Sequence, residues 1–470
     1  MGPLTGVEVC IDGDRGVASE AGDLLSRYGA SVRASGEFSR CASVTVFGRG
    51  CSPGRARMSG PVAPCQGLPA AAPTRAAAGL LAVGALAAAR VGGEVVVDAD
   101  SAAILLLQPL VLAHWYSAPT PVRVTPLRIG AGWVATELGA PGDDDLFALL
   151  RRTTLFDDPE ELSTAAQEWR LPVVPYRREL TSRHLSRARL DHHELLSPGD
   201  RLPPEVSSIA APPLAGVKVM EVTAMWAGPL CTWLLAQMGA SVLSIESDAR
   251  PDGMRAPNGG GIYPGGLLIP GTNDRSAMFL ALAEGKQRVN LDLRVRDDRK
   301  AFDDACAEVD LRVDSLSRRA RDNLGIDYWG QSRRGPAIVH LPAYSYGPTR
   351  DWVSYGTQIH AMSGLAWPRG TDEPIPAATA YVDALGGIAG ALASVAALYA
   401  ATQQHEPPRL TASLMDAVET LSADSDRGTL LRGDPMPRVS ELVESHAARA
   451  AEVTVAGRRV RHPASPFIWA

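Results

Sequence analysis

Apolar residues recur along this chain in short alternating runs and in longer Ala- and Leu-rich runs. Val7 and Val9 alternate with polar neighbours, which predicts a strand, and the Ala/Leu-rich segment after them predicts a helix. Residues 217–246 contain strand-like VKVMEV, helix-like AGPLCTWLLAQMG and strand-like SVLSIE. This alternation predicts an α/β fold with a Rossmann-like, mainly parallel sheet between flanking helices, together with a smaller α+β domain.

The longest apolar run extends from Ala384 to Ala401 and directly follows Asp383. Three glycines and a serine dilute the run, so we interpret it as a helix buried in a protein core rather than a membrane span. An Asp at the start of a helix can accept backbone N–H bonds and meet the positive end of the helix dipole. From this run alone, Asp383 is interpreted as a helix cap.

Two parts of the sequence share the same phrases. Residues 3–9 and 213–219 both read Pro-Leu-x-Gly-Val-x-Val, and Gly-Ala-Ser-Val closes the predicted helix that follows each. Met-Ser-Gly occurs at 58–60 and again at 362–364, each time before an Ala-rich run. About 25 residues separate Val32 from Met58, but about 120 separate Val242 from Met362. We therefore expect an internally duplicated chain whose first copy has lost most of its middle.

The repeat divides the chain into four parts. We expect a degenerate large-domain copy at 1–102, a small α+β domain at 103–205, a full large domain at 206–430 and a C-terminal tail at 431–470 that returns to the fold.

Composition and charge exclude several classes of function. A net charge of −6 gives no sign of a nucleic-acid surface or a polybasic membrane patch. The six cysteines form no CxxC pair, and the N-terminus has no basic segment followed by an apolar one, so we expect free thiols in a cytoplasmic protein. We interpret the pair His192–His193 as solvated and the glycines at 259–261 as a loop, and we expect no metal.

Short phrases follow one another in order between about 213 and 420. They are Pro213–Val219, Ala227-Gly228-Pro229, Gly239-Ala240 with Glu246, Gly285-Lys286 followed by Leu291-Asp292-Leu293, Leu324-Gly325, Met362-Ser363-Gly364, and Asp383 four residues before Gly387. This ordered set resembles the family III CoA-transferases, the family of formyl-CoA and carnitine-CoA transferases and α-methylacyl-CoA racemases. The first copy and the 103–205 segment resemble the same family more faintly, the latter as its small domain.

The resemblance implies that Asp383 is the nucleophile of a CoA-transferase. Its carboxylate, expected to be ionised at neutral pH, would attack an acyl-CoA thioester and form first a mixed anhydride and then an aspartyl-CoA thioester. A carboxylic acid acceptor would then take the CoA. Backbone N–H groups near Gly386 and Gly387 would hold the developing oxyanion. The cap and nucleophile interpretations are compatible, because the helix dipole favours an ionised carboxylate in both.

The resemblance also implies contacts to coenzyme A, which enters as the acyl-CoA substrate. Met225, Trp226 and Ala227 lie where family members line the adenine pocket, and Lys286 lies where a basic residue meets the nucleotide phosphates. Core packing explains a buried Trp226 equally well. The sequence departs from the family pattern at Ser247-Asp248, Ser315-Leu316 and Glu406-Pro407-Pro408.

Two alternative functions remain open. The racemase branch uses a His-Asp pair shortly before the Met-Ser-Gly phrase, but this sequence has Tyr355-Gly356 there, and we expect the nearby His360 to be structural. A non-catalytic acyl-CoA-binding subunit is the second alternative.

The two copies differ in what each has lost. Matching Gly79 to Gly387 puts Arg75 at the nucleophile position of the first copy, so we expect that copy to be inactive. Family III enzymes are interlocked dimers, and in this chain only the first copy is followed by a small-domain-like segment. We therefore expect an intrachain pseudo-dimer in which the 103–205 segment covers Asp383, and a further homodimer is compatible with it.

Overall fold

The structure is a computed structural model of the 470-residue chain. It describes residues 2–12, 15–34, 42–47, 53–118, 124, 126–138, 142–153, 156–178, 212–256, 261–263, 276–326, 335–345, 347–368, 370–402, 407–422, 430–446, 450–455 and 458–469. The pair His192–His193 and most of the glycine cluster at 259–261 lie outside the described residues, so their interpretations stay predictions.

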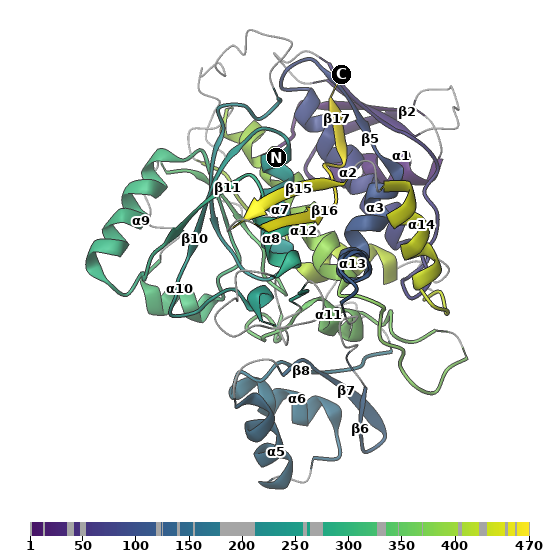
Figure 1. Ribbon diagram of the computed structural model, residues 1–470, viewed down its shortest axis with the longest axis vertical. Coiled ribbons are helices and arrows are strands. Elements are labelled where there is room, and N and C mark those ends of the chain that lie inside the picture. The colour runs from purple at the N-terminus through teal and green to yellow at the C-terminus, as the bar shows by residue number, and fades with distance from the viewer. Residues whose placement is uncertain are drawn as a thin grey trace.

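A six-stranded, fully parallel sheet forms the second half of the fold (Figure 1). Its order is β11-β10-β9-β12-β13-β14. The strands are β9 (Lys218–Val222), β10 (Ser241–Glu246), β11 (Lys286–Asn290), β12 (Leu311–Asp314), β13 (Ala337–His340) and β14 (Arg409–Thr411). The order reverses between β9 and β12, and ligands of such sheets bind at this point, beyond the carboxyl ends of the strands. The predicted Rossmann-like parallel sheet is confirmed.

Helices cover both faces of this sheet. The α-helices described in this half are α7 (Ala227–Gln237), α8 (Ala277–Ala283), α9 (Arg296–Glu308), α10 (Arg318–Leu324), α11 (Gly356–Met362), α12 (Tyr381–Ala401) and α13 (Leu414–Ser422), of which α7, α9 and α12 contact the strands of this sheet. Small side chains on α7 and α12 allow the two helices to pack closely beside the sheet.

A second six-stranded sheet of mixed direction combines five strands from the first half of the chain with one from the C-terminal tail. Its order is β17-β5-β4-β3-β1-β2, with β1 (Glu8–Asp12), β2 (Ser31–Ala34), β3 (Ser43–Phe47), β4 (Gly54–Met58), β5 (Glu94–Val97) and β17 (Phe467–Trp469). The pairs β1–β2 and β4–β5 are parallel, as are β9–β10 and β13–β14, whereas β3 runs antiparallel to both its neighbours.

The direction of β3 follows from the length of chain around it. Parallel neighbours need a crossover of a dozen or more residues, and β2, β3 and β4 all lie within Ser31–Met58. The strand order β2-β1-β3-β4-β5 otherwise matches β10-β9-β12-β13-β14. A shortened copy of the larger sheet would produce this arrangement.

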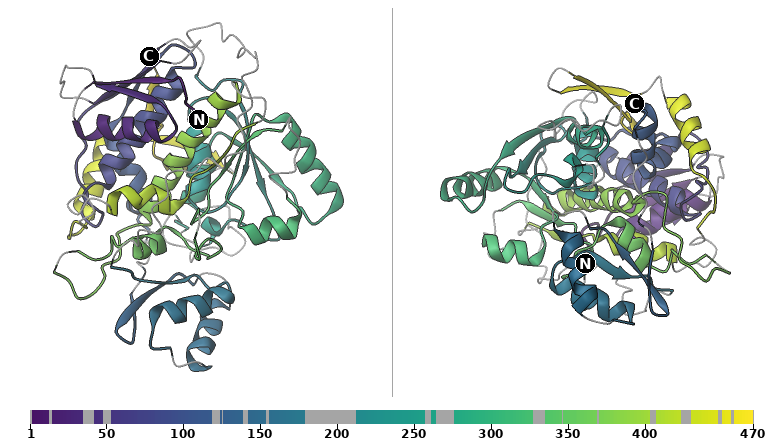
Figure 2. Two further views of the ribbon diagram at one scale, coloured as in Figure 1. Left: turned by 180° about the vertical axis from the view of Figure 1, so that it is seen from behind. Right: turned by 60° about the horizontal axis from the view of Figure 1, so that its bottom comes forward.

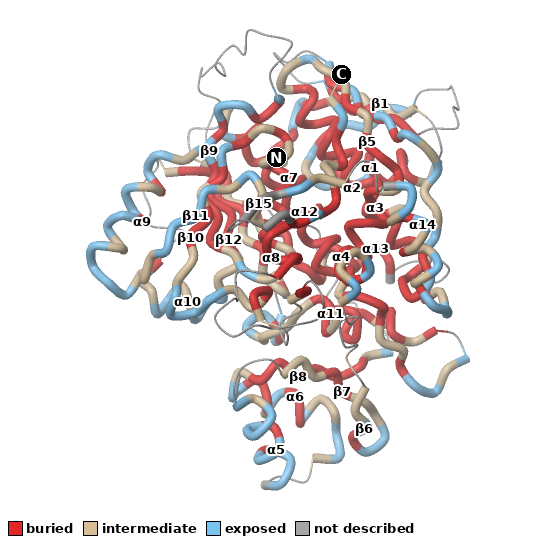
Figure 3. The backbone as a smooth tube through the Cα atoms, in the orientation of Figure 1, coloured by how far each residue is buried: buried red, intermediate tan, exposed pale blue. Residues whose placement is uncertain are grey.

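Two buried helices join the halves. Helix α12 packs against α7, α13 and α2 (Ala72–Ala88), and α2 packs against α1 (Arg15–Arg27) and α3 (Ala99–Leu106). Figure 3 shows both α2 and α12 in the buried interior. By length and composition alone, helix α12 could cross a membrane. In the structure, however, 89% of its most apolar stretch is buried inside the protein. The prediction that this run is a core helix is confirmed.

The small domain stands apart at one end of the molecule (Figures 1 and 2). It comprises β6 (Leu127–Ile129), β7 (Gly132–Thr136), α5 (Asp143–Thr153), α6 (Pro159–Glu168) and β8 (Val173–Pro175) around its own apolar core. Helices α3 and α4 (Gln108–Trp115) belong instead to the main core. The small domain therefore starts near residue 126, later than the expected boundary at 103.

The C-terminal tail returns to the first half of the chain. It contains α14 (Met436–His446), the hairpin of β15 (Ala451–Val455) and β16 (Arg458–His462), and β17. Helix α14 packs against α4, and β17 pairs antiparallel with β5 at the edge of the mixed sheet.

Candidate active site

Asp383 lies in the first turn of α12 rather than before the helix. The helix begins at Tyr381, and its N-cap residue Ala380 makes no side-chain cap bond. The Asp383 carboxylate forms its hydrogen bond with a different helix. Its Oδ2 accepts the backbone N–H of Gly356, the first residue of α11, at 3.3 Å. The sequence-based interpretation of Asp383 as a cap of its own helix is wrong, because the carboxylate satisfies the start of α11 instead.

The surroundings of Asp383 favour the protonated acid. The pKa of Asp383 is raised to about 8, mainly by burial and in smaller part by the Glu137 carboxyl, against the lowering effect of the hydrogen bond from Gly356. A carboxylate removed from water loses more solvation than one hydrogen bond returns. The expectation of an Asp383 already ionised at neutral pH is therefore wrong for this arrangement.

The small domain covers the start of α11. The hydroxyl of Thr357 donates to Oε2 of Glu137, which directly follows β7. The side-chain amide of Gln358 also donates to a small-domain residue, at the carbonyl of Pro172.

Three further hydrogen bonds hold the two domains together nearby. The Gln167 side chain accepts the N–H of Val353 at 2.7 Å and donates to its carbonyl at 2.9 Å. The N–H of Arg177 donates to the carbonyl of Ala361 at 3.1 Å. These contacts fix the small domain against α11 and the segment that precedes it.

Gly386 and Gly387 lie inside α12 and serve its packing. A backbone N–H in an α-helix donates to the carbonyl four residues earlier, so neither glycine offers a free N–H to an oxyanion. A Cβ on Gly387 would lie 2.7 Å from the Ala227 carbonyl oxygen and 3.0 Å from the Leu230 Cβ. The geometry disagrees with the oxyanion role that the resemblance implied, and it assigns Gly387 to the close approach of α7.

The three residues expected around the adenine differ in exposure. Trp226 is 1% exposed and belongs to the main apolar core, so the packing interpretation fits it. Met225 and Ala227 are partly exposed. Met225 adopts a positive φ of 69°, and its N–H donates to Oδ1 of Asp252 at 3.0 Å. This half-buried carboxyl, whose pKa is raised to about 6 mainly by desolvation, also accepts the N–H of Met254 and so anchors the loop before α7.

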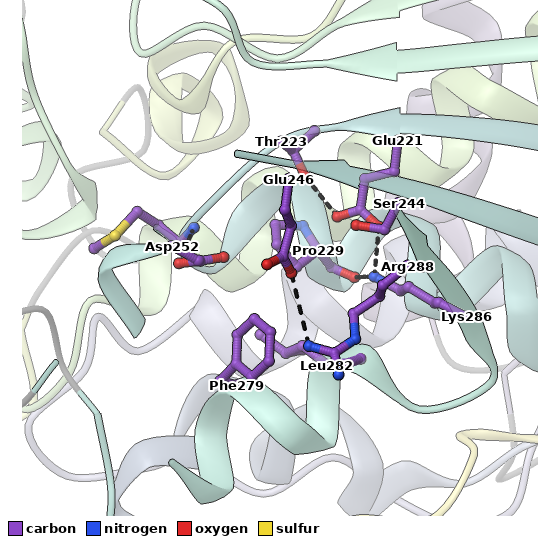
Figure 4. Close-up of a pocket in the computed structure, with 12 residues that line it drawn as sticks. Glu221, Thr223, Pro229, Ser244, Glu246, Asp252, Phe279, Leu282, Lys286 and Arg288 are labelled. Carbon is purple, nitrogen blue, oxygen red and sulfur yellow. Dashed lines mark hydrogen bonds and ion pairs between the residues drawn. The ribbon is translucent and has the colours of Figure 1, made fainter. Parts of the chain in front are cut away.

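A pocket opens at the carboxyl ends of β9 and β10, between α7 and α8 (Figure 4). Its lining includes Met225, Glu246, Phe279, Lys286 and Arg288. Asp383 is not among the described residues that line it. The pocket and the buried carboxyl are therefore separate features of this structure.

The ammonium group of Lys286 donates all its hydrogen bonds to other residues of this protein. Its ammonium group lies 2.9 Å from Glu221 Oε2, 2.8 Å from the Pro229 carbonyl oxygen and 2.7 Å from Thr232 Oγ1, and its side chain is 2% exposed (Figure 4). An ammonium has three N–H donors, and all three are engaged. This geometry disagrees with the phosphate contact that the resemblance implied for Lys286.

Two arginines that sequence reasoning missed supply positive charge to the pocket region. Arg255 pairs with Glu246 at 2.5 Å and lies over the Phe279 ring, 3.8 Å from its centroid. Arg288 lies 3.9 Å from Glu246 and 5.2 Å from the same ring, and its side chain is 33% exposed. Arg288 sits two residues after Lys286 on β11, and the period of two along a strand is the signal that could have identified it.

His360 and Arg75 both have structural partners. The Nε2 of His360 faces the Ile375 carbonyl oxygen, and its Nδ1 faces the Tyr381 hydroxyl, each at 3.1 Å. Burial lowers the pKa of His360 to about 4, so the imidazole is neutral. Arg75, on α2, forms a buried ion pair with Glu20 at 3.0 Å. The arrangement of His360 fits the structural role expected for it.

Comparison with curated proteins gives one consistent group. The chain is 26% identical over 233 residues to a succinate–glutarate CoA-transferase of Agrobacterium fabrum, covering 48% of this chain and 57% of that protein. It is 25% identical to the β subunit of a succinyl-CoA–L-malate CoA-transferase of Chloroflexus aurantiacus (44% and 50% covered) and 27% identical to a formyl-CoA:oxalate CoA-transferase of Bradyrhizobium diazoefficiens (44% and 48%). The chain thus spans about half the length of the curated relatives it matches.

Solved structures give weaker matches over a similar share of the chain. A hypothetical protein from Mycobacterium tuberculosis aligns at 21% identity and a TM-score of 0.39, covering 45% of this chain and 58% of that one. A CaiB/BaiF family protein from Brucella suis aligns at 23% identity and a TM-score of 0.38, covering 45% and 56%.

The family model for CoA-transferase family III matches residues 214–449, half of the sequence. The chain belongs to CoA-transferase family III.

Proposed function

We propose that this protein transfers CoA from an acyl-CoA donor to a carboxylic acid acceptor through a covalent intermediate at Asp383. The observation that carries the proposal is a buried carboxyl at the start of α11, enclosed by the small domain. The family match includes this residue, and the relatives above are named for CoA transfer to or from carboxylic acids.

The chemistry requires only that Asp383 ionise. One carboxylate oxygen attacks the thioester carbonyl carbon, so that a C–O bond forms, the C–S bond breaks and the electron pair leaves on the CoA sulfur. The thiolate then attacks the aspartyl carbonyl of the anhydride and releases the donor acid. The acceptor carboxylate attacks the aspartyl thioester, and the returning thiolate produces the new acyl-CoA and restores Asp383.

The small domain would protect these intermediates. Anhydrides and thioesters hydrolyse when water reaches them, and a closed site excludes it. Asp383 is 9% exposed beneath Glu137 and Thr357, which supports this role.

The pocket beside α8 would receive the nucleotide part of CoA. Arg288 is the partly exposed cation there, and Met225 gives an apolar contact. We assign the phosphate contact to Arg288 in place of Lys286, because the Lys286 donors are already engaged.

We also propose that the two unequal halves form an intrachain pseudo-dimer. The shared strand order of the two sheets, the direct packing of α2 on α12 and the position of the small domain over α11 support it. In this arrangement the segment that follows the first copy completes the site of the second. The first copy has Arg75 at the position that matches the nucleophile, and this arginine is held in a buried ion pair with Glu20.

A non-catalytic acyl-CoA-binding subunit is the second candidate, favoured by the raised pKa of Asp383, because a protonated carboxyl is a poor nucleophile. The racemase alternative is weaker, because His360 is neutral and bound to Tyr381 and Ile375.

Trapping with hydroxylamine separates the first two functions. The wild type is incubated with succinyl-CoA and hydroxylamine, and the peptide that contains residue 383 is analysed by mass spectrometry. A hydroxamate at Asp383, absent from Asp383→Asn, supports transfer. CoA binding with an unmodified Asp383 across a panel of acyl-CoA donors would support the binding subunit.

A further inference from the structure

Two carboxyl groups from different domains converge on neighbouring residues of α11. Gly356 donates its backbone N–H to Asp383, and the next residue, Thr357, donates its hydroxyl to Glu137. Asp383 is buried in α12, whereas Glu137 is partly exposed at the end of β7. The N–H of Glu137 donates to the carbonyl of Pro172 at 3.1 Å, which fixes the strand end that carries it.

The charges around this pair do not neutralise it. Within the described part of the chain, neither Asp383 nor Glu137 forms a salt bridge with a Lys or Arg. Burial raises the pKa of the Tyr355 hydroxyl at the start of α11, and the Glu137 and Asp383 carboxyls each raise it further. The other charged groups that act on Tyr355 are Asp143 of α5, which raises its pKa, and Arg250 of the loop after β10, which lowers it.

We propose that Glu137 and Asp383 share one proton near neutral pH, and that Glu137 is the positioning residue that decides whether Asp383 is ionised. Two neighbouring carboxylates, one buried and one half-buried, are costly to ionise together, so the pair loses its two protons in separate steps. The effect of this sharing on catalysis rests on the proposed CoA transfer. The sharing itself does not.

The shared proton explains how a raised pKa is compatible with nucleophilic attack. Burial raises the pKa of both carboxyls, and the Glu137 carboxyl raises the pKa of Asp383 further. When the proton is on Glu137, Asp383 is ionised although no proton has left the closed site. During attack a C–O bond forms, the C–S bond breaks and the electron pair goes to sulfur, while Glu137 keeps its O–H bond. The proton returns to Asp383 after release.

Thr357 biases where the proton lies. A hydroxyl that donates to Glu137 stabilises its ionised form and lowers its pKa, so it keeps the proton on Asp383. In Thr357→Val this bias is lost, and Asp383 should ionise at a lower pH than in the wild type.

Glu137→Gln tests the proposal in the full-length protein. Gln keeps the shape and the acceptor for Thr357 but removes the neighbouring negative charge, so the pKa of Asp383 falls. The acid limb of the kcat/KM profile should then move to lower pH, and activity at pH 6 relative to pH 9 should rise several-fold. Glu137→Asp keeps the charge and should keep the wild-type limb, as should Glu168→Gln on the exposed face of α6. An unchanged limb in Glu137→Gln overturns the proposal.

A titration without substrate separates this proposal from the proposed function. Infrared difference spectra between wild type and Asp383→Asn identify the Asp383 carboxyl, whose ionisation is then followed with pH in both Glu137 backgrounds. A lower midpoint in Glu137→Gln supports the shared proton even if no hydroxamate forms at Asp383. An equal midpoint overturns the sharing even if the hydroxamate does form.

Discussion

Asp383 and Gly356 lie so close that a Cβ on Gly356 would be 2.8 Å from the Asp383 Oδ2 and 2.9 Å from the Ala380 carbonyl oxygen. The absence of a side chain at 356 therefore lets the Asp383 carboxylate reach the start of α11. In the racemase pattern this position carries the Asp of a His-Asp pair. Here the second carboxyl at the site, Glu137, comes from the small domain instead.

Asp383→Asn should stabilise the protein at neutral and alkaline pH. The folded-state pKa of Asp383 is raised to about 8, so its ionisation costs stability as pH rises above the unfolded value near 4, and the cost stops growing above pH 8. Thermal unfolding should show equal stability near pH 4 and a gain for Asn of up to about 5 kcal/mol at pH 8. A variant less stable than the wild type at pH 8 contradicts the buried-acid description.

Gly387→Ala should destabilise the protein by about 1–3 kcal/mol, because its methyl group meets the backbone oxygen of Ala227. Gly386→Ala is the matched control. Its methyl group meets mainly the end of the Leu414 side chain, which can move, and a better helix former gains up to about 1 kcal/mol. Equal denaturant midpoints for the two variants would count against the packing role of Gly387.

Arg75→Ala should destabilise the fold by about 3–5 kcal/mol, because it leaves the buried Glu20 carboxylate without its cation. Activity per folded molecule should stay within a few-fold of the wild type. The double variant Arg75→Met with Glu20→Met should recover most of the stability. A hundredfold loss of kcat in soluble, folded Arg75→Met/Glu20→Met would mean that Arg75 acts on the reaction.

Arg288→Ala should raise KM for the CoA donor about tenfold and change stability little, because the side chain is partly exposed at the pocket. Lys286→Met should do the reverse: it leaves Glu221 buried without its cation, so stability falls while KM per folded molecule changes less. Arg294→Ala, at an exposed site paired with Asp292, controls for a general loss of positive charge. A rise in KM for Lys286→Met alone would restore the phosphate role to that lysine.

The larger sheet and its core helix could be predicted from the sequence because their patterns are local. Strand-like VKVMEV became β9, and the Ala-rich run after Asp383 became part of α12. The start of the helix could not be predicted because Tyr381 and Val382 fit a strand or a helix equally well. The sequence pattern therefore puts Asp383 before the helix, whereas it is the third residue of α12.

The environment of Asp383 could not be predicted because it depends on long-range contacts. Glu137 is far from Asp383 in sequence and reaches it only through the docking of the small domain. The engagement of Lys286 by Glu221, Pro229 and Thr232 likewise requires β9, α7 and β11 to be assembled. A resemblance to a family predicts which residue occupies a position. Whether the N–H donors of that residue are free to bind a ligand depends on how the elements around it pack.

The fate of oxygen during turnover tests the central claim most directly. A carboxylic acid acceptor labelled with 18O is supplied together with an acyl-CoA donor under single-turnover conditions. If the acceptor carboxylate attacks an aspartyl-CoA thioester at Asp383, one labelled oxygen stays on Asp383 when the new acyl-CoA leaves. The account predicts that the peptide with residue 383 becomes heavier by one labelled oxygen. Turnover that leaves this peptide unlabelled, with all label in the new acyl-CoA and free acid, would contradict it.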